Sequence, residues 1–374
     1  MINNPAIGSY GCQPRGLVMI NGQRLVGLIS FTVDNNSFFQ ADTFRVEFSL
    51  PAQPAGMGFD YWSMQEQLLV ECFIGFPTDP VNYTRLDLSS LLLGYVDDIE
   101  FDPNQGTVTL AGRDLTSKLI EYKNTITFNS GSLVASDIVT KIAKERGLTP
   151  VVTPTSTPAG SYYQIVKSLV ESNSTYWDII CKLAQIERYQ AYVVGSSLYF
   201  EPITPLDSNP YMIDWFPDDG INTVFSNAPR LTFSRNLSIA KDLRVRVMSF
   251  DQKTKKVVNE VADRKRVYNQ TTRKVARSSD PPQEYIYNVP NLTSQQAQAR
   301  AQAILEEISK HEMNLRAELP GDLLLNPRNI VRVRGTSSAF DQAYYPGSIT
   351  RTYSLTEGFV MHLTAKNQTP NQPA

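Results

Sequence analysis

The sequence has few of the side chains that hold metal ions or carry acid–base catalysis. In 374 residues it has two histidines, His311 and His362, and three cysteines, Cys12, Cys72 and Cys181. The cysteines lie far apart and are odd in number, which favours free thiols in a reducing compartment over a disulfide framework. No HExxH or CxxC motif is present, and a lone histidine is a weak signal for a ligand. We therefore predict no metal site and no histidine-based triad.

Other signatures are also missing. The sequence has no GxSxG, GxxxxGKS/T or GxGxxG motif, so it lacks the common nucleophile and phosphate-binding loops. No apolar run approaches the roughly 20 residues that span a bilayer, and residues 1–16 do not resemble a secretory signal. A formal net charge of −2 creates no overall field that would attract nucleic acid or anionic lipid. We expect no catalytic, cofactor-binding or metal-binding residues, no cofactor and no stable membrane association.

The residues that are present indicate an ordered globular protein. Hydrophobic residues make up 41% of the chain and charged residues 19%, and the length allows two or three domains. Strand patterns fill residues 17–111. Residues 43–50 alternate strictly between apolar and polar, and Asn21-Gly22 suits a type I′ hairpin turn. About six strands at this spacing predict a small antiparallel barrel or sandwich.

The period then changes to that of helices. Residues 133–146 can form a helix that ends before Gly147. A second helix begins after Ser174-Thr175, with Asp178 at capping-box distance from Thr175. A hairpin over 189–201 follows it. We interpret residues 123–205 as a compact α/β insert.

Strand patterns return after residue 205. LRVRV (243–247) and IVRVRG (330–335) share an alternation that places arginines on one face and valines on the other. Between them, residues 293–313 predict a helix with one apolar stripe: Ala297, Ala301, Ile304, Leu305, Ile308 and Leu315. More strands are expected at 348–355 and 359–365. This echo between LRVRV and IVRVRG, together with the mixed helical stretch that interrupts each β region, is explained either by two related barrels with insertions or by chance.

Two groups of basic residues have alternative interpretations. Residues 253–277 hold nine basic side chains against two acidic ones. This run can contact nucleic-acid phosphates, dock on an acidic protein neighbour or remain solvated, and its single aromatic, Tyr268, argues against a stacking site for nucleic acid. The rows Arg244/Arg246 and Arg332/Arg334 form either an assembly interface or an ordinary solvated sheet face.

Acidic residues raise the question of catalysis. Asp97-Asp98 and Asp218-Asp219 are adjacent carboxylate pairs, but neighbours on a strand point to opposite faces, and Asp218-Asp219 begins a turn. In the motif GRDL (112–115) we expect Asp114 to cap a short helix, which would stabilise the fold by about 1 kcal/mol. Arg113 would then be free to bridge a neighbouring element or subunit. Both interpretations are structural.

The order of these segments resembles the late control protein D, or tail-hub, family of contractile-tailed bacteriophages. The resemblance rests on a strand pair ending in GRDL and followed by SKLIEYK, on STYWDIICKLA (174–184) leading into YVVGSSLYFEP, and on a Gln/Ala-rich helix before LPGDLLLNPRNIVRVRG and SITRTYSLTEGFVMHLTAKN. It covers residues 17 to 366. One departure is the polar stretch 187–191, where a glycine is expected between the second helix and its hairpin; another is the long basic run.

The resemblance implies a β-rich α+β fold with two tube-like antiparallel β-barrel domains and α/β insertions. Its expected segments are a first barrel (1–122), an α/β insert (123–205), a second barrel (206–252 and 320–366), a basic loop plus helix (253–319) and a flexible tail (367–374). We expect the protein to act by assembly and as a conduit, without catalysis. The resemblance implies a homotrimer that forms a pseudo-sixfold ring in the virion tail baseplate, assembled in the host bacterial cytoplasm.

The implied partners are the tail tube protein, the central spike and other baseplate proteins, with DNA passing through the lumen without sequence-specific binding. Candidate interface residues are Arg113, Arg244, Arg246, Arg332 and Arg334. Two alternatives remain open. One is the hub of a related contractile injection machine. The other is a β-rich cell-wall or glycan-binding module or hydrolase, which would need converging carboxylates of perturbed pKa.

Overall fold

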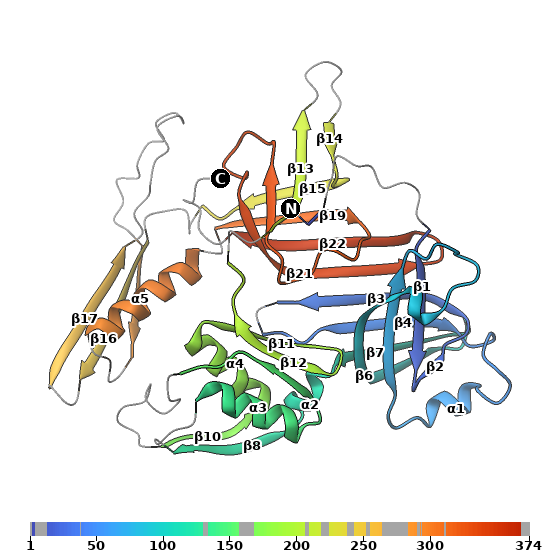
Figure 1. The fold of residues 1–374 in the computed structure, drawn as a ribbon, viewed down its shortest axis with the longest axis horizontal. Coiled ribbons are helices and arrows are strands. Elements are labelled where there is room, and N and C mark those ends of the chain that lie inside the picture. The colour runs from blue at the N-terminus through green and yellow to red at the C-terminus, as the bar shows by residue number, and fades with distance from the viewer. Residues whose placement is uncertain are drawn as a thin grey trace.

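A computed structural model describes residues 2–3, 13–37, 39–129, 134–156, 168–205, 209–217, 224–237, 243–251, 255–263, 283–289, 292, 294–309 and 312–367. Among these residues, most regular structure is β (Figure 1). The protein is therefore β-rich α+β, as the sequence predicts. The second cysteine, Cys72, is buried and Cys181 is half-buried, and both are free thiols; Cys12 and His311 lie outside the described residues.

Fourteen strands form one large sheet. The early ones are β1 (Arg15–Ile20), β2 (Gln23–Arg24), β3 (Leu28–Asn36), β4 (Thr43–Ser49), β5 (Leu69–Gly75), β6 (Ser89–Asp102) and β7 (Thr107–Asp114). The late ones are β13 (Tyr211–Pro217), β14 (Val224–Ser226), β15 (Arg230–Arg235), β19 (Met313–Pro320), β20 (Val331–Arg334), β21 (Ala343–Ser354) and β22 (Gly358–Asn367). The short helices α1 (Phe59–Ser63) and α2 (Ser117–Ile120) and the 3₁₀ turn Arg85–Asp87 lie in the connections.

The large sheet contains the same strand order twice. Strands β3-β4-β7-β6-β5-β1, here called the N-terminal set, are hydrogen-bonded in that order. Strands β15-β19-β22-β21-β20-β13, the C-terminal set, follow the same order when each is matched by its place in the chain. One connection differs, because β13 runs parallel to β20 whereas β1 runs antiparallel to β5. The two sets are thus topological copies apart from the direction of one edge strand.

The two sets are joined by direct pairing of β3 with β21. Figure 1 shows β15, β19, β22, β21, β3 and β4 following one another across the upper and central part of the molecule, with β7 and β6 continuing at the right. Alternate side chains of both sets fill one continuous core, from Val33, Val46 and Leu110 to Ile349 and Leu363. The early and late strand regions are therefore one body.

A buried polar cluster lies at this junction. The Arg351 guanidinium of β21 donates to the Asn35 side chain of β3 and to the Leu325 carbonyl. Asn35 in turn donates to a carboxylate oxygen of Asp42 at 2.7 Å. Burial lowers the pKa of Arg351 to about 10, against the opposing effect of Asp322 and Asp42. A charged side chain thus ties the two sets together from inside.

The α/β insert has its own core. It consists of β8 (Lys123–Asn129), α3 (Ala135–Glu145), β9 (Thr149–Val152), β10 (Ser168–Thr175), α4 (Tyr176–Glu187), β11 (Tyr189–Val194) and β12 (Ser197–Pro202). The predicted capping box between Thr175 and Asp178 is present, and Gly147 follows α3 with φ of +67°. Where the family pattern leads us to expect a glycine, Arg188 itself adopts a left-handed conformation, with φ of +58°.

The insert is fastened to both sets of the large sheet. The Trp177 indole N–H of α4 donates to the Phe39 carbonyl at 2.9 Å. On the other side, the Arg328 guanidinium lies over the Tyr192 ring, 4.3 Å from its centroid, and the Tyr345 hydroxyl donates to the Thr204 carbonyl. The insert is therefore packed below the large sheet in Figure 1, in contact with both sets.

A third unit projects to one side, at the left of Figure 1. Strands β16 (Leu243–Asp251), β17 (Lys256–Asp263) and β18 (Gln283–Asn288) form their own sheet, covered by α5 (Ser294–Ser309). Ala297, Ala301 and Leu305 of α5 are buried against the valines of β16. Leu315, the last residue of the predicted stripe, instead lies on β19, because the helix ends at Ser309.

This unit corrects one expectation about the second barrel. The sequence places residues 243–251 in that barrel through the echo of LRVRV with IVRVRG, but β16 pairs with β17 and β18 and not with the large sheet. Alternation of valine and arginine specifies only that one face is buried, and here α5 buries it. The echo between the two sequences is therefore not the repeat that the fold contains.

Candidate assembly surface

One face of the large sheet is polar across eight strands, β6-β7-β4-β3-β21-β22-β19-β15, four from each set. It is built by alternation, since residues on one side of each strand fill the core and those on the other side point outward. Serine and threonine predominate: Ser30, Thr32, Thr43, Thr232, Ser234, Ser348, Thr350, Thr352, Ser354 and Thr364. We call this the hydroxyl-rich face. Val360 of β22, opposite Thr352, is an apolar side chain on the same face.

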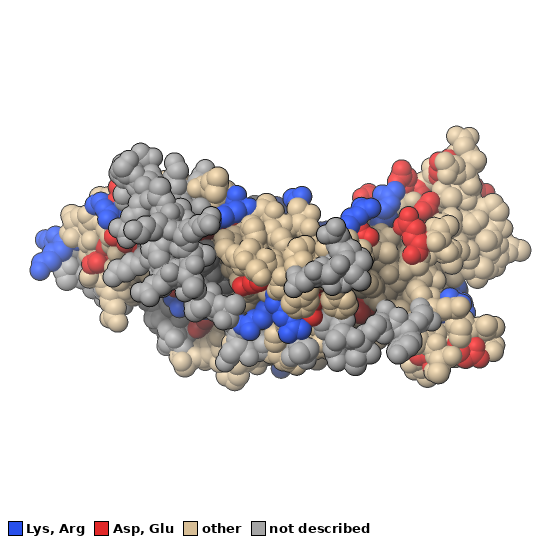
Figure 2. All heavy atoms as spheres, turned by 90° about the horizontal axis from the view of Figure 1, so that it is seen from above, with Lys and Arg blue, Asp and Glu red and all other residues tan. Residues whose placement is uncertain are grey.

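Hydrogen bonds run from strand to strand across the hydroxyl-rich face. The Ser30 hydroxyl donates to Glu47 at 3.2 Å, and the Thr32 and Thr352 hydroxyls are 3.4 Å apart across the junction. Two residues further along the same two strands, the Thr350 hydroxyl donates to Asp34. Charges of both signs lie among the hydroxyls, for example Asp34, Arg45 and Glu47 on β3 and β4. The molecule seen from above likewise shows both basic and acidic side chains on its surface (Figure 2). The face therefore offers many weak polar contacts and no strong field of one sign.

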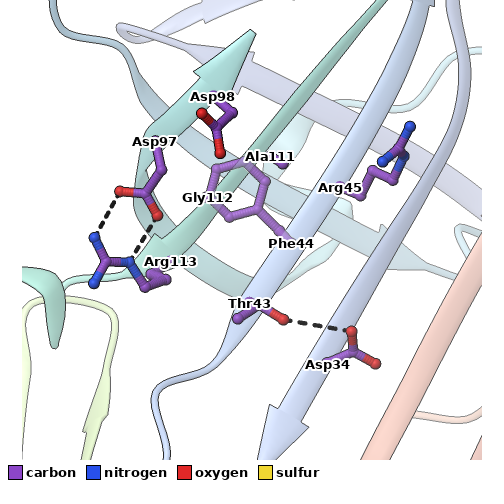
Figure 3. Close-up of a pocket in the computed structure, with 9 residues that line it drawn as sticks. All are labelled: Asp34, Thr43, Phe44, Arg45, Asp97, Asp98, Ala111, Gly112 and Arg113. Atoms are coloured by element: carbon purple, nitrogen blue, oxygen red, sulfur yellow. Dashed lines mark hydrogen bonds and ion pairs between the residues drawn. The ribbon is translucent and has the colours of Figure 1, made fainter. Parts of the chain in front are cut away.

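At the β6 end of this face lies a shallow hollow of about 300 Å³. Asp34, Thr43, Arg45, Asp97, Asp98 and Arg113 line it, together with Phe44, Ala111 and Gly112 (Figure 3). The prediction that Asp97 and Asp98 point to opposite faces is wrong. The pairing of β6 with β7 shifts between Val96 and Asp98, and such a bulge brings consecutive side chains to the same side. Asp218 and Asp219 lie outside the described residues.

Arg113 is fixed by the first of these aspartates. Its guanidinium forms two hydrogen bonds to the Asp97 carboxylate, at 2.7 and 2.8 Å, and lies 3.4 Å from Glu121. The hydrogen bond to Asp97 raises the pKa of Arg113 above its usual value. Arg113 thus bridges β7 to β6 and to the end of α2, within the same chain. Because Asp97 is ion-paired with Arg113, Asp97 and Asp98 do not form the free pair of carboxylates that glycoside hydrolysis requires.

Asp114, next to Arg113, lies on the inner side of the strand. Its carboxylate accepts hydrogen bonds from the Thr116 backbone N–H at 3.1 Å and the Thr116 hydroxyl at 3.0 Å. Thr116 is the N-cap residue of α2, so Asp114 shapes the turn before the helix and does not cap its first turn as predicted. Burial, with the nearby Asp42 charge, raises the pKa of Asp114 to about 8.

The other candidate interface arginines are distributed over two sheets. Arg244 and Arg246 lie on β16, where Arg244 pairs with Asp263 at 2.7 Å and Arg246 with Glu284 at 2.7 Å. The hydrogen bond to Asp263 raises the pKa of Arg244. Both partners are on the neighbouring strands β17 and β18. These two side chains therefore form ion pairs between neighbouring strands of the projecting unit.

Arg332 and Arg334 lie on β20 of the large sheet. Arg334 forms two hydrogen bonds with Asp214 of the parallel strand β13, one of them 2.9 Å long, and Asp214 is buried. This contact raises the pKa of Arg334. Arg332 is exposed on the same side of β20. The two arginine rows are thus in different units, and their role as an assembly interface stays a prediction.

The expectations about metal ions and membranes can be compared only with the described part of the chain. No group of three or more histidine, cysteine or acidic side chains there is arranged to hold a metal ion. Among the same residues, no helix is long and apolar enough to cross a bilayer. His362, on β22, is exposed on the hydroxyl-rich face. Most of the basic run 253–277 lies outside the described residues.

Two residues that the sequence analysis did not select occupy the ends of the hydroxyl-rich face. Glu100 stands on β6 and Arg230 on β15, and their side chains are 72% and 84% exposed. Each has a partner within the chain, Arg45 at 3.1 Å and Glu318 at 3.5 Å respectively. Only the strand order reveals that both residues lie on edges of the same sheet, so no sequence motif could identify them.

Comparison with known proteins gives a consistent result at the level of the fold. No family model and no curated protein sequence matches the chain. Among solved structures, a tail protein from Neisseria meningitidis MC58 is similar over 96% of this chain and 99% of its own, at 15% identity and a TM-score of 0.67. The 43 kDa tail protein of prophage MuSo2 from Shewanella oneidensis is similar over 96% and 97%, at 13% identity and a TM-score of 0.65.

A third similar structure comes from a secretion system. The E. coli c3393 protein, a type VI secretion component with structural similarity to bacteriophage T4 tail proteins gp27 and gp5, matches at 11% identity and a TM-score of 0.53. The match covers 96% of this chain and 79% of that protein. The fold is thus shared with phage tail proteins and a related secretion component, as the tail-hub resemblance implies.

Proposed function

We propose that the protein is the structural hub of a contractile phage tail, a homotrimer that joins the tail tube to the central spike. The observation that carries this proposal is the repeated strand order of the N-terminal and C-terminal sets. A chain with two equivalent strand sets would offer two equivalent units to a ring. Three such chains would present six units. The ring could then match a sixfold tail tube at one end and a threefold spike at the other.

The hydroxyl-rich face supports this role, because in such a ring it would line the channel. A wall of serine and threonine with charges of both signs has no strong attraction for a phosphate backbone, since that attraction depends on clustered lysine and arginine. DNA could pass such a wall without sequence-specific contact. The tail tube, the spike and other baseplate proteins would contact the two rims, the insert and the projecting unit. The protein would then act by assembly in the virion, without catalysis.

The proposal predicts a trimer in solution. Native mass spectrometry of the purified full chain should give a species of three times the 41.9 kDa chain mass. When the concentration of the purified protein is raised in the absence of tube and spike proteins, the share of trimer should increase. Dimers should not be the final species. A protein that stays monomeric at every concentration, and that also digests cell walls in a zymogram, would instead be the hydrolase considered above.

The hub of a contractile secretion machine is the second candidate. The similarity to a type VI secretion component favours it. The same assembly physics applies in that case, and the two candidates differ in partner and location, which are the virion baseplate for one and the secretion apparatus for the other. Co-purification with tail tube and spike proteins from phage particles would distinguish them.

A further inference from the structure

We infer that neighbouring copies join by strand pairing, with the second half of β6 in one copy hydrogen-bonded antiparallel to β15 of the next. This inference rests on the trimer proposed above and names the contact that would close it. Both strands are edges of the eight-strand polar sheet. In the described residues, β15 pairs only with β19, and β5 covers β6 only along Ser89–Tyr95.

The junction inside the chain is the template for this contact. There the end strand of the N-terminal set, β3, pairs antiparallel with the second half of β21 in the C-terminal set. By strand order, β15 is the counterpart of β3 and β6 is the counterpart of β21. The two strands that could form the equivalent contact, β15 and the second half of β6, are thus available at the two ends of the polar sheet. Among the described residues of a single chain these two ends are not paired with each other, but a second copy can supply the missing strand.

The hairpins fix how β6 matches β21. At the end of β21, Ser354 lies opposite Gly358 of β22, and at the end of β6, Asp102 lies opposite Thr107 of β7. Counting back from these ends, Thr352 of β21 corresponds to Glu100 of β6. By the same count, Thr350 corresponds to Asp98.

The adjoining strands fix how β15 matches β3. On β3, Thr32 lies opposite Arg45, which lies opposite Ala111 of β7. On β15, Arg230 lies opposite Glu318, which lies opposite His362 of β22. Ala111 and His362 are each four residues beyond the hairpin ends described above. Arg230 therefore corresponds to Thr32, and Thr232 corresponds to Asp34.

Transferring the internal pairing gives the register between copies. Inside the chain, Thr352 pairs with Thr32 and Thr350 pairs with Asp34. Between copies, Glu100 would pair with Arg230, and Asp98 with Thr232. The first is a salt bridge between opposite charges directly across the strands. The second repeats the threonine–aspartate hydrogen bond of the junction with the two residue types exchanged between the strands.

The chemistry of the two edges agrees with this register, which follows from strand pairing alone. The β6 segment 96–102 reads VDDIEFD, with four acidic and no basic residues, whereas β15 reads RLTFSR, with two arginines and no acidic residue. Their core-side residues also match, since Ile99 and Phe101 on β6 and Leu231 and Phe233 on β15 are all partly buried apolar side chains. Complementary charge on two unpaired edges favours pairing of the edges with each other.

Cysteine cross-linking tests the register. The variant carrying both Glu100→Cys and Arg230→Cys, in the full chain, should form a covalent trimer under mild oxidation, because the corresponding hydroxyls at the junction are only 3.4 Å apart. Neither single variant should form a covalent trimer. The double variant with Glu100→Cys and Glu318→Cys should not form one either, because Glu318 places the second thiol one strand away from Arg230. A trimer by native mass without the 100–230 bond would overturn the strand pairing and leave the proposed hub intact. A monomer would overturn both.

Charge reversal provides a second test that does not depend on disulfide geometry. Glu100→Arg or Arg230→Glu alone should raise the concentration at which half of the chains are assembled by at least about tenfold, since like charges would face each other at every contact. The double variant should restore assembly to near the wild-type concentration. Circular dichroism of each single variant checks that the chain still folds. Equal weakening in the single and double variants would contradict the pairing of these two residues.

Discussion

Replacing Arg351 with methionine should lower the free energy of unfolding by about 3 to 5 kcal/mol, as breaking a buried charge cluster does. Methionine keeps much of the side-chain volume but leaves the Asn35 carbonyl oxygen and the Leu325 carbonyl without their donor. The buried Asp42 carboxyl would also lose a nearby positive charge that lowers its pKa. Urea denaturation followed by tryptophan fluorescence would measure the change.

The matched control is Arg45→Met, two strands away on the hydroxyl-rich face. Arg45 is 61% exposed and its partner Glu100 is 72% exposed, so this change should cost at most about 1 kcal/mol. If Arg351→Met were as mild as the control, the buried cluster would not hold the two sets together. Both substitutions remove a positive charge from the same sheet, but only Arg351 is buried. A difference between their losses of unfolding free energy can therefore be assigned to burial.

Asp114→Asn should remove a pH dependence of stability. The pKa of Asp114 is about 8 in the folded protein, against about 3.9 in an unfolded chain. Between these values the folded state holds a proton that the unfolded state has released, so this group's contribution falls as pH rises from about 4 to about 8. Asparagine stays neutral and can still accept from the Thr116 N–H. The variant should therefore be more stable than the wild type at pH 8.5, by several kcal/mol at most, and by a much smaller margin at pH 5.

Unfolding free energies at pH 5 and pH 8.5 would test this, with Asp60→Asn as the control. Asp60 lies exposed in the first turn of α1, so its replacement should leave the difference between the two pH values as it is in the wild type. Asp42 is buried nearby and its pKa is also raised, so some pH dependence of the same sign should persist in Asp114→Asn. An unchanged slope in that variant would show that Asp114 is ionised in the folded protein at neutral pH.

The elements of this fold were largely predictable because they depend on local patterns. Alternation identified the strands, and the Thr175–Asp178 capping box placed the start of α4. Two failures came from non-local effects. The bulge at Asp97 depends on how β6 meets β7, and the sheet that β16 joins depends on which partner covers its valines. Neither partner is encoded in the few residues concerned.

The assembly surface was harder to predict for a similar reason. The arginines chosen from sequence are conspicuous by their spacing, yet Arg113, Arg244, Arg246 and Arg334 all have acidic partners within the chain. Glu100 and Arg230 are ordinary exposed side chains in the sequence. Their significance arises from the repeated strand order, which places them at opposite ends of one sheet. The repeated strand order is a pattern of hydrogen bonding between strands that are distant in the sequence. In the sequence, only the tail-hub resemblance points to such a repeat.

The equivalence of the N-terminal and C-terminal sets in a ring is tested most directly by a three-dimensional electron cryomicroscopy reconstruction of the purified particle. We predict three chains, with six strand sets around one channel and the hydroxyl-rich face turned toward that channel. A particle in which this face points outward, or in which the two sets occupy non-equivalent positions in the wall, would contradict it.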